Sequence, residues 1–250
     1  MSRSLRLLSY NIQRGGHGRE GAIAAVIREA EPDLVVLQEA TSPQVVEGLA
    51  QATAMRGWGS RPGQSLAFLS RDPVTDAQWR RPRLSRHAFL DILPSAGSWR
   101  VFGLHLSAVH AAWTERRRLY ELGALLAAVR RQQAGPHALV GDFNTLAPGE
   151  LLDFRKLPAR LRALVWLSGG RVRWRTIQAV LDAGYGDAFR SLHPDTVGST
   201  FPTWDPHARL DYVFVPVPHL TRVELCEVLD GNRVREASDH LPLLCGLGQI

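Results

Sequence analysis

Two segments decide the fold of this chain: RLDYVFV at residues 209–215 and ASDHLP at residues 237–242. In the first, Asp211 heads a run of strongly β-forming residues, and in the second Asp239 and His240 stand at the start of the last apolar strand. A buried strand needs no charged residue, and burying an unpaired charge costs free energy. We therefore interpret these side chains as site residues at the ends of buried strands.

Three further polar insertions occur upstream, at Asn11, at Glu39 and in GDFN at residues 141–144. Each follows an apolar run with the composition of a strand. Any one of them alone would more often be a capping residue or a hydrogen-bonded core residue. Five such insertions in one chain, each at a strand end, instead indicate one shared site.

The composition is that of a globular protein. The chain has 250 residues, of which 45% are hydrophobic and 22% are charged. No apolar run approaches the roughly 18 residues of a membrane helix. The first eleven residues lack the apolar length and the cleavage site of a signal peptide. We predict a single domain over residues 1–250, a cytoplasmic location, and no stable membrane insertion.

Positive charge is unevenly distributed. The formal net charge is +6, and residues 154–178 carry seven basic side chains and no acidic one. Lys156 is the only lysine, so arginine enrichment throughout the chain reduces the weight of this signal. A basic surface still favours a polyanionic substrate. We therefore treat residues 150–178 as a basic insert and Arg171, Arg173 and Arg175 as candidate substrate ligands.

The two cysteines, Cys226 and Cys245, both lie in apolar, strand-like segments. Two buried thiols are the favoured interpretation, and a disulfide between neighbouring strands remains an alternative. Their spacing does not match a zinc site.

Hydrophobic periodicity and the positions of glycine and proline predict an α/β protein of two packed sheets with helices outside. The four strands between residues 66 and 105 are expected to form an antiparallel meander. The predicted helices are residues 20–30, 44–52, 114–132 and about 177–181, and the predicted strands are 5–9, 34–37, 66–69, 74–79, 87–93, 99–105, 137–140, 210–215, 221–229 and 241–247.

These polar residues suit the hydrolysis of a phosphate ester. That reaction needs a cation, an oriented water and hydrogen-bond donors around the phosphate. Glu39 and Asp239 are hard oxygen ligands suited to Mg²⁺ or Mn²⁺. Asp142 and Asn144, two residues apart, are expected on one face of a strand end, where one accepts a water proton and the other donates to oxygen.

The histidines complete this chemistry. His105 and His240 are candidate donors to the phosphate. Asp211 is the candidate partner that sets the tautomer and charge of His240.

Six short motifs appear in order along nearly the whole chain. They are LSYNI (8–12), LQE (37–39), GLHL (103–106), GDFN (141–144), RLDY (209–212) and SDH (238–240). Together they resemble the endonuclease/exonuclease/phosphatase superfamily, which includes DNase I, abasic-site endonucleases, sphingomyelinases and inositol polyphosphate 5-phosphatases. The resemblance implies a four-layer α/β sandwich of two packed mixed β-sheets flanked by helices. It also implies Mg²⁺-dependent (or Mn²⁺-dependent) phosphoester cleavage without a covalent intermediate.

The resemblance also implies residue roles. By motif position, Glu39 and Asp239 are metal ligands, with Asn11 and Asp142 close by. The pair Asp142 and Asn144 orients water and phosphate, and Asp211 with His240 forms the acid/base pair.

Two positions depart from the abasic-site version of these motifs. His105 stands where abasic-site enzymes carry a tyrosine, and Gln13 stands where they carry a second acidic ligand. Both departures argue against a dedicated abasic-site role and put a second metal contact in doubt.

The motifs leave the substrate class open. Trp204, in the loop before the Asp211 motif, is a candidate stacking residue, and Arg209 is a candidate phosphate ligand. The leading hypothesis is a nuclease acting on DNA or RNA. The alternatives are a phosphatase or phosphodiesterase of a small phosphoester or phospholipid headgroup, and a catalytically silent binding module. No protein partner is implied.

Overall fold

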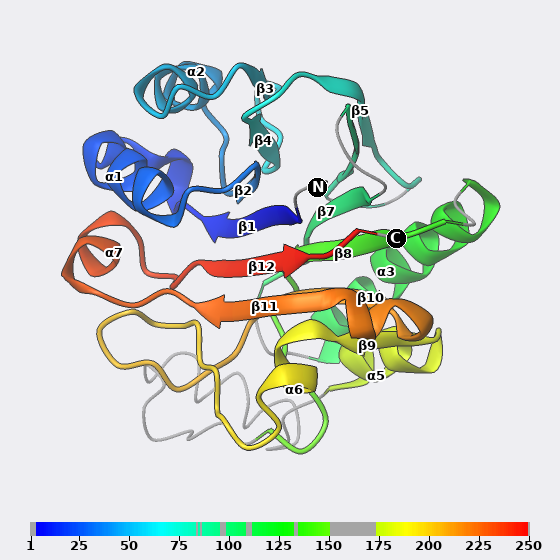
Figure 1. Cartoon of the computed structure of the whole chain (residues 1–250). Helices are drawn as coiled ribbons and strands as arrows, with labels where there is room; N and C mark the ends of the chain where they lie inside the picture. Colours follow the sequence, from blue (N-terminus) through cyan, green and yellow to red (C-terminus); the bar gives the residue numbers. More distant parts are fainter. Residues whose placement is uncertain are drawn as a thin grey trace.

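Two six-stranded β-sheets form the centre of the structure (Figure 1), a computed structural model that describes residues 4–83, 85, 87–95, 99–108, 112–132, 135–150 and 174–249. The first sheet has the order β11-β12-β1-β2-β4-β3, and the second has the order β5-β6-β7-β8-β10-β9. The strands of the first sheet are β1 (Leu5–Asn11), β2 (Leu34–Gln38), β3 (Gly57–Gly59), β4 (Ala67–Ser70), β11 (Val223–Val228) and β12 (Leu243–Leu247). Those of the second are β5 (Val74–Arg80), β6 (Phe89–Pro94), β7 (Arg100–His105), β8 (His137–Asp142), β9 (Tyr185–Asp187) and β10 (Asp211–Pro216).

Each sheet is mixed, with one parallel pair at its centre. β1 pairs parallel with β2, and β7 pairs parallel with β8, while the other pairings are antiparallel. Parallel neighbours need a long crossover, and the chain supplies a helix in both places: α1 (Glu20–Ala30) and α3 (Ala112–Gln132). These crossovers bring the carboxyl ends of each parallel pair to the same edge of their sheet.

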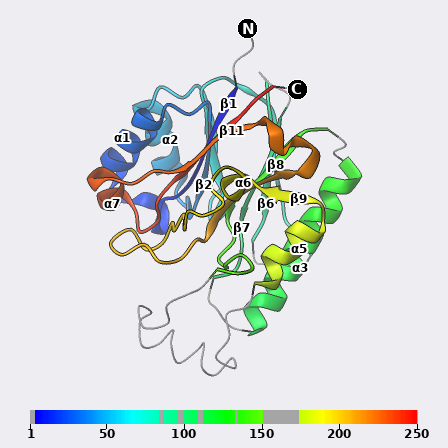
Figure 2. The same ribbon diagram turned by 60° about the horizontal axis from the view of Figure 1, so that its bottom comes forward.

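Helices cover both outer faces (Figure 2). The helices α1, α2 (Pro43–Ala52) and α7 (Asn232–Ala237) pack on the first sheet. The helices α3 and α5 (Arg175–Asp182) pack on the second. Three shorter elements complete the described structure: α6 (Ala188–Leu192) and the 3₁₀ helices η1 (Arg14–Gly16) and η3 (Val217–Arg222).

Three apolar cores separate the four layers. One lies between the first sheet and its helices, one between the two sheets, and one between the second sheet and α3 with α5. The buried faces of the strands alternate between neighbouring cores: Leu8 and Tyr10 of β1 face the helices, whereas Leu7 faces the other sheet. The predicted four-layer α/β sandwich is therefore confirmed.

The predicted meander is wrong in one respect. β5, β6 and β7 form antiparallel neighbours as expected, but β4 belongs to the other sheet, between β2 and β3. All four residues of β4 are buried, so it sits inside a sheet, whereas edge strand β5 is only partly buried. The sequence analysis also left β3, β9, α6 and α7 unassigned, because segments of three to six residues carry little periodicity.

Cys226 and Cys245 are free, buried thiols. They are directly opposite each other on the antiparallel strands β11 and β12. The structure therefore agrees with the favoured interpretation of two buried thiols.

No described helix is both long enough and apolar enough to cross a membrane.

Candidate active site

The sheet topology explains why polar residues far apart in sequence meet. Asn11 ends β1 and Asp142 ends β8, each in a parallel pair. His105 ends β7 and is in register with Asp142. Because β10 and β12 run antiparallel to these strands, their first residues reach the same edge, so Asp211 pairs directly with Asp142. Asp239 and His240 lie in the segment just before β12, separated from it by Leu241 and Pro242, and reach this edge from the first sheet.

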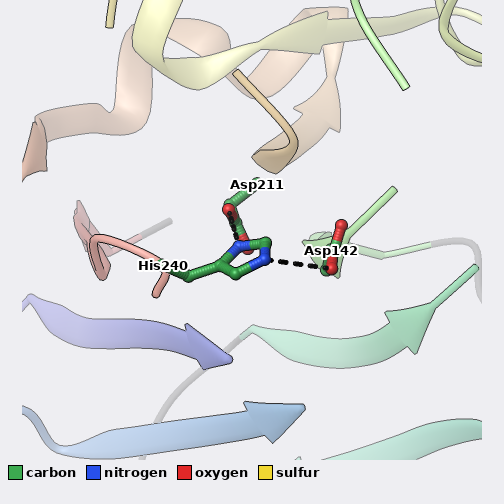
Figure 3. A group of neighbouring side chains, drawn as sticks. All are labelled: Asp142, Asp211 and His240. Atoms are coloured by element: carbon green, nitrogen blue, oxygen red, sulfur yellow. Dashed lines mark hydrogen bonds and ion pairs between the residues drawn. The ribbon is translucent and has the colours of Figure 1, made fainter. Parts of the chain in front are cut away.

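Asp142, Asp211 and His240 form a buried cluster between the sheets (Figure 3). Nδ1 of His240 lies 2.9 Å from Oδ2 of Asp211, and Nε2 lies 3.9 Å from Oδ2 of Asp142. One ligand atom from each residue lies within 4.8 Å of the others. The imidazole is thus placed between two carboxylates, one at each ring nitrogen.

Thr200 holds Asp211 in place. Its hydroxyl donates to Oδ2 of Asp211 over 2.6 Å and accepts from the backbone N–H groups of Leu210 and Asp211. The ring of Phe201 lies 4.8 Å from that of His240 and covers it. Sequence analysis missed Thr200, because nothing in its local context distinguishes it from other loop threonines.

The charges in this cluster depend on one another. Burial alone would lower the pKa of His240, but the negative charge of Asp211, its hydrogen bond and the charge of Asp142 raise it well above the usual value. Burial, and next the charge of Asp211, raise the pKa of Asp142. A protonated imidazole donates from both nitrogens and cannot bind a metal. With His240 protonated, the cluster can store and transfer a proton, whereas with His240 neutral its three ligand atoms lie close enough together to hold a metal ion.

Glu39 and Asp239 fit a hard divalent cation. Oε2 of Glu39 accepts from the N–H of Arg14 (2.6 Å), and Oδ2 of Asp239 accepts from Nε2 of Gln13 (2.8 Å). Burial raises the pKa of Asp239, the charge of His240 lowers it, and the neighbouring charge of Glu39 raises it. Among the described residues, neither carboxylate has a basic side chain as an ion-pair partner, and both are partly exposed. Carboxylate oxygens that are not ion-paired with an arginine suit Mg²⁺ or Mn²⁺.

Asn11 connects the two parts of the site. Its Nδ2 donates to Oδ2 of Asp142 over 3.1 Å and lies 3.5 Å from Oε1 of Glu39. Asn11 is buried, so its amide Nδ2 is directed at these two carboxylates and not at solvent. The amide therefore links the candidate metal ligand to the carboxylate of the buried cluster.

Asn144 and His105 line the same region from the second sheet. The backbone N–H of Asn144 donates to Oδ1 of Asp142 (2.8 Å), and its Nδ2 donates to the carbonyl of Leu106 (3.0 Å). Nε2 of His105 lies 3.7 Å from Oδ2 of Asp142, and Nδ1 contacts the hydroxyl of Ser65. Ser65, which the sequence analysis missed, also accepts from the N–H of Glu39 (3.1 Å).

The candidate substrate ligands are more scattered. Trp204 is 70% exposed, and its ring lies 6.4 Å from Phe201, which covers His240. Arg175 is exposed at the start of α5, whereas Arg171 and Arg173 lie outside the described residues.

Arg209 has a different environment from the one predicted. It is 3% exposed, and its guanidinium pairs with Glu150 (2.7 Å) and Asp187 (2.6 Å). It also stacks on the ring of Tyr212 at 4.4 Å. Glu150 accepts from its Nε, and the two carboxylates offset its charge, so Arg209 is held by protein groups in a buried position.

Two cavities bear on the position of the site. One of about 780 Å³ is lined by Glu150, Asp187, Arg190 and Arg209 and is separate from the buried cluster. A smaller one of about 310 Å³ opens beside Glu39 and His105. The larger cavity contains none of the polar residues that meet at the strand ends, whereas the smaller one includes Glu39 and His105.

Comparison with known proteins agrees with this geometry. The model of the Endonuclease/Exonuclease/phosphatase family matches residues 8–240. The chain belongs to this family. As a family member, it is a phosphoester hydrolase that works with a divalent metal ion. A search of curated proteins finds no match.

Solved structures share the family fold at low identity. A 3′-5′ exonuclease (NExo) from Neisseria meningitidis is 19% identical, with a TM-score of 0.76, over 98% of this chain and 100% of that chain. An AP endonuclease from Archaeoglobus fulgidus is 17% identical, with a TM-score of 0.76, over 97% and 99%. An endonuclease/exonuclease/phosphatase from Beutenbergia cavernae DSM 12333 is 22% identical, with a TM-score of 0.69, over 98% and 72%.

Proposed function

We propose that this protein is a Mg²⁺-dependent phosphodiesterase that cleaves nucleic acid by in-line attack of water. The observation that carries this is the position of Asp142, whose Oδ2 accepts from Asn11 and faces the imidazoles of His105 and His240. The carboxylate of Asp142 therefore contacts Asn11, which lies beside the candidate metal ligand Glu39, and also faces the two histidines. Support for a nucleic-acid substrate comes from the net charge of +6 and from the exposed Trp204, whose ring neighbours Phe201, the residue that covers His240.

In this proposal Asp142 accepts the proton of the attacking water. Its raised pKa makes it a stronger base than an exposed aspartate. The N–H of Asn144 and the amide of Asn11 orient the carboxylate, one at each oxygen. The water oxygen forms its bond to phosphorus as its proton moves to Asp142, and the bond to the leaving oxygen breaks on the opposite side.

The two histidines donate to the phosphate. His240, held protonated by Asp211, presents N–H to the non-bridging oxygens as negative charge develops. When Nδ1 of His105 accepts from Ser65, its Nε2–H points toward the space beside Asp142. Glu39 and Asp239, with Asn11 close by, would hold the cation, which when bound stabilises charge on the phosphoryl and leaving oxygens.

A substrate panel tests the proposal. Purified protein with Mg²⁺ or Mn²⁺ is given plasmid DNA, single-stranded DNA, RNA, abasic DNA, bis-p-nitrophenyl phosphate, inositol phosphates and sphingomyelin. We expect cleavage of a nucleic acid with kcat/KM at least about a hundredfold above that for the chromogenic diester, because remote contacts contribute binding energy. Preferential turnover of inositol phosphates or sphingomyelin would replace the nuclease proposal with the small-phosphoester alternative.

Asp211 and His240 should behave as one unit. Asp211→Asn and His240→Ala are each expected to lower kcat about 10²- to 10⁴-fold, since each removes the charged imidazole from the transition state. The double variant should be hardly slower than His240→Ala, because Asp211 acts through the imidazole. Steady-state kinetics on one substrate measures this cycle, and multiplicative losses would show that the two residues act independently.

Trp204 is expected to stack on a base. Trp204→Ala should raise KM for single-stranded DNA about tenfold with a smaller change in kcat, as expected for the loss of one aromatic stacking contact. Trp58→Ala is the matched control, because Trp58 is also exposed (40%) but lies on β3 at the edge of the first sheet. Equal effects of both substitutions on KM would show that Trp204 does not contact the substrate.

A further inference from the structure

A polar pocket of about 310 Å³ adjoins the active site and shares Glu39, Ser65 and His105 with it, but its residues Arg14 and His87 have no role in the site described above. We call it the Arg14–His87 pocket. Its lining residues are Arg14, Glu39, Thr41, Gly63, Gln64, Ser65, His87 and His105.

The sheet order places this pocket at one end of the active site. Moving along the first sheet from β12 through β1 to β2, the strand ends present Asp239, Asn11 and Glu39 in turn. Moving along the second from β10 to β7, they present Asp211, Asp142 and His105. Trp204 and Phe201 therefore stand at the His240 end, while the pocket stands at the Glu39 end. A phosphate reacting near Asp142 has the aromatic pair on one flank and the pocket on the other.

The walls of the pocket are held by strained backbone. Gln13, Arg14 and Glu39 are non-glycine residues with positive φ values of 50°, 49° and 56°. Such conformations carry backbone strain and persist only where surrounding bonds enforce them. Those bonds are present: the N–H of Arg14 donates to the side-chain carboxylate of Glu39, and the N–H of Gly15 donates to the backbone carbonyl of Glu39. The exposed side chain of Arg14 is thus presented at the pocket from a rigid turn.

The lining of the pocket is rich in hydrogen-bond donors and carries one arginine. The imidazoles of His87 and His105 lie side by side with ring centroids 5.2 Å apart, and Arg14 supplies a permanent positive charge. Among the described residues that line the pocket, Glu39 is the only acid, and its carboxylate belongs to the candidate metal site. The volume is at the lower end of the range for ligand sites. A pocket of this volume can hold one phosphate group together with part of the attached sugar.

We propose that the Arg14–His87 pocket binds a second substrate phosphate, the one next to the scissile phosphate on the Glu39 side. The proposal rests on the proposed phosphodiesterase function and names what that site recognises: two consecutive phosphates. Arg14 and His87 are then specificity residues, which do not touch the reacting atoms. Arginine suits the role because its planar fork can donate two hydrogen bonds to one phosphate.

Isothermal titration calorimetry tests this without any turnover. Thymidine 3′,5′-bisphosphate and the two thymidine monophosphates are titrated in turn into the protein with Ca²⁺ present. The bisphosphate should bind wild-type protein about tenfold or more tightly than either monophosphate, since one additional charge-assisted contact is made. Arg14→Gln and His87→Asn should each bring that ratio down to about two or less, and Arg14→Lys should give an intermediate ratio.

Arg61→Gln is the matched control. Arg61 is also exposed and carries the same charge, but its guanidinium lies over the ring of Trp79, 4.7 Å from the centroid, and it does not line the pocket. Its ratio should equal that of wild type, and thermal unfolding of every variant checks that the fold is retained. Because each variant is compared with itself across ligands, a change in metal affinity cancels from the ratio.

Two results would overturn the proposal: equal affinities for mono- and bisphosphate in wild type, or a ratio that survives both Arg14→Gln and His87→Asn. Failure of the nuclease proposal looks different. In that case the protein leaves DNA and RNA intact, yet the bisphosphate preference and its loss in the variants remain, and the substrate would be a small molecule with two phosphates.

Discussion

Removal of divalent cations is expected to abolish turnover of every phosphoester that this protein hydrolyses. Glu39 and Asp239 lie near each other at the strand ends without a basic side chain paired to either among the described residues. Without a cation, a negatively charged phosphate approaching these carboxylates would be repelled, and the leaving oxygen would lose its stabilisation. Treatment with EDTA followed by dialysis should reduce the rate to background, and Mg²⁺ or Mn²⁺ should restore it.

The metal should also be detectable without catalysis. Mn²⁺ should raise the Tm of the metal-free protein, because a ligand that binds only the folded state stabilises it. Glu39→Gln should weaken that shift, whereas Glu47→Gln on the outer helix α2 should leave it unchanged. Undiminished turnover after chelation would contradict the dependence on a metal ion. A Tm shift of the same size in Glu39→Gln would show that Glu39 is not a ligand of the metal.

Asp142→Asn is expected to lower kcat about 10³- to 10⁵-fold at saturating metal. The substitution removes the proposed base, and general-base catalysis alone contributes about 10²- to 10⁴-fold. It also removes the negative charge that faces His105 and His240. Single-turnover kinetics should show that the chemical step, and not product release, has slowed.

This variant should still fold. Because burial raises the pKa of Asp142, its charged form is less favourable in the folded state than in the unfolded state at neutral pH. An amide removes that penalty and loses the bond from Asn11, so Tm should change by only a few degrees. Asp195→Asn is the control on an exposed loop aspartate. A loss of activity that follows unfolding, or a kcat near wild type, would contradict the role of Asp142 as base.

Local sequence patterns were sufficient for most of the fold. The helix over residues 20–30 was predicted with the bounds it has, and the strands beginning at residues 5, 34 and 137 were each extended only at their ends. These segments are long or fully apolar, so their hydrophobic periodicity determines them. The short elements β3, β9, α6 and α7 were not predictable in this way, because packing against neighbours and not local preference forms them.

For the candidate site too, the sequence indicates some features and only the structure shows others. Asn11, Glu39, Asp142, Asp211 and His240 could be proposed from sequence, because a polar residue at the end of an apolar run stands out against its context. Their roles remain proposals, but their proximity follows from the structure.

What the sequence by itself determined is the longer strands, the polar residues at five of their ends and, through ordered motifs, the family. Only the tertiary structure decided which polar neighbours support those residues. Ser65 contacts His105 and Thr200 contacts Asp211 because sheet order and loop packing bring them together, and Arg209 is withdrawn from solvent by carboxylates from other elements. The physical reason is that hydrogen bonds and ion pairs act over a few ångströms in space, whereas sequence patterns record only what lies a few residues away along the chain.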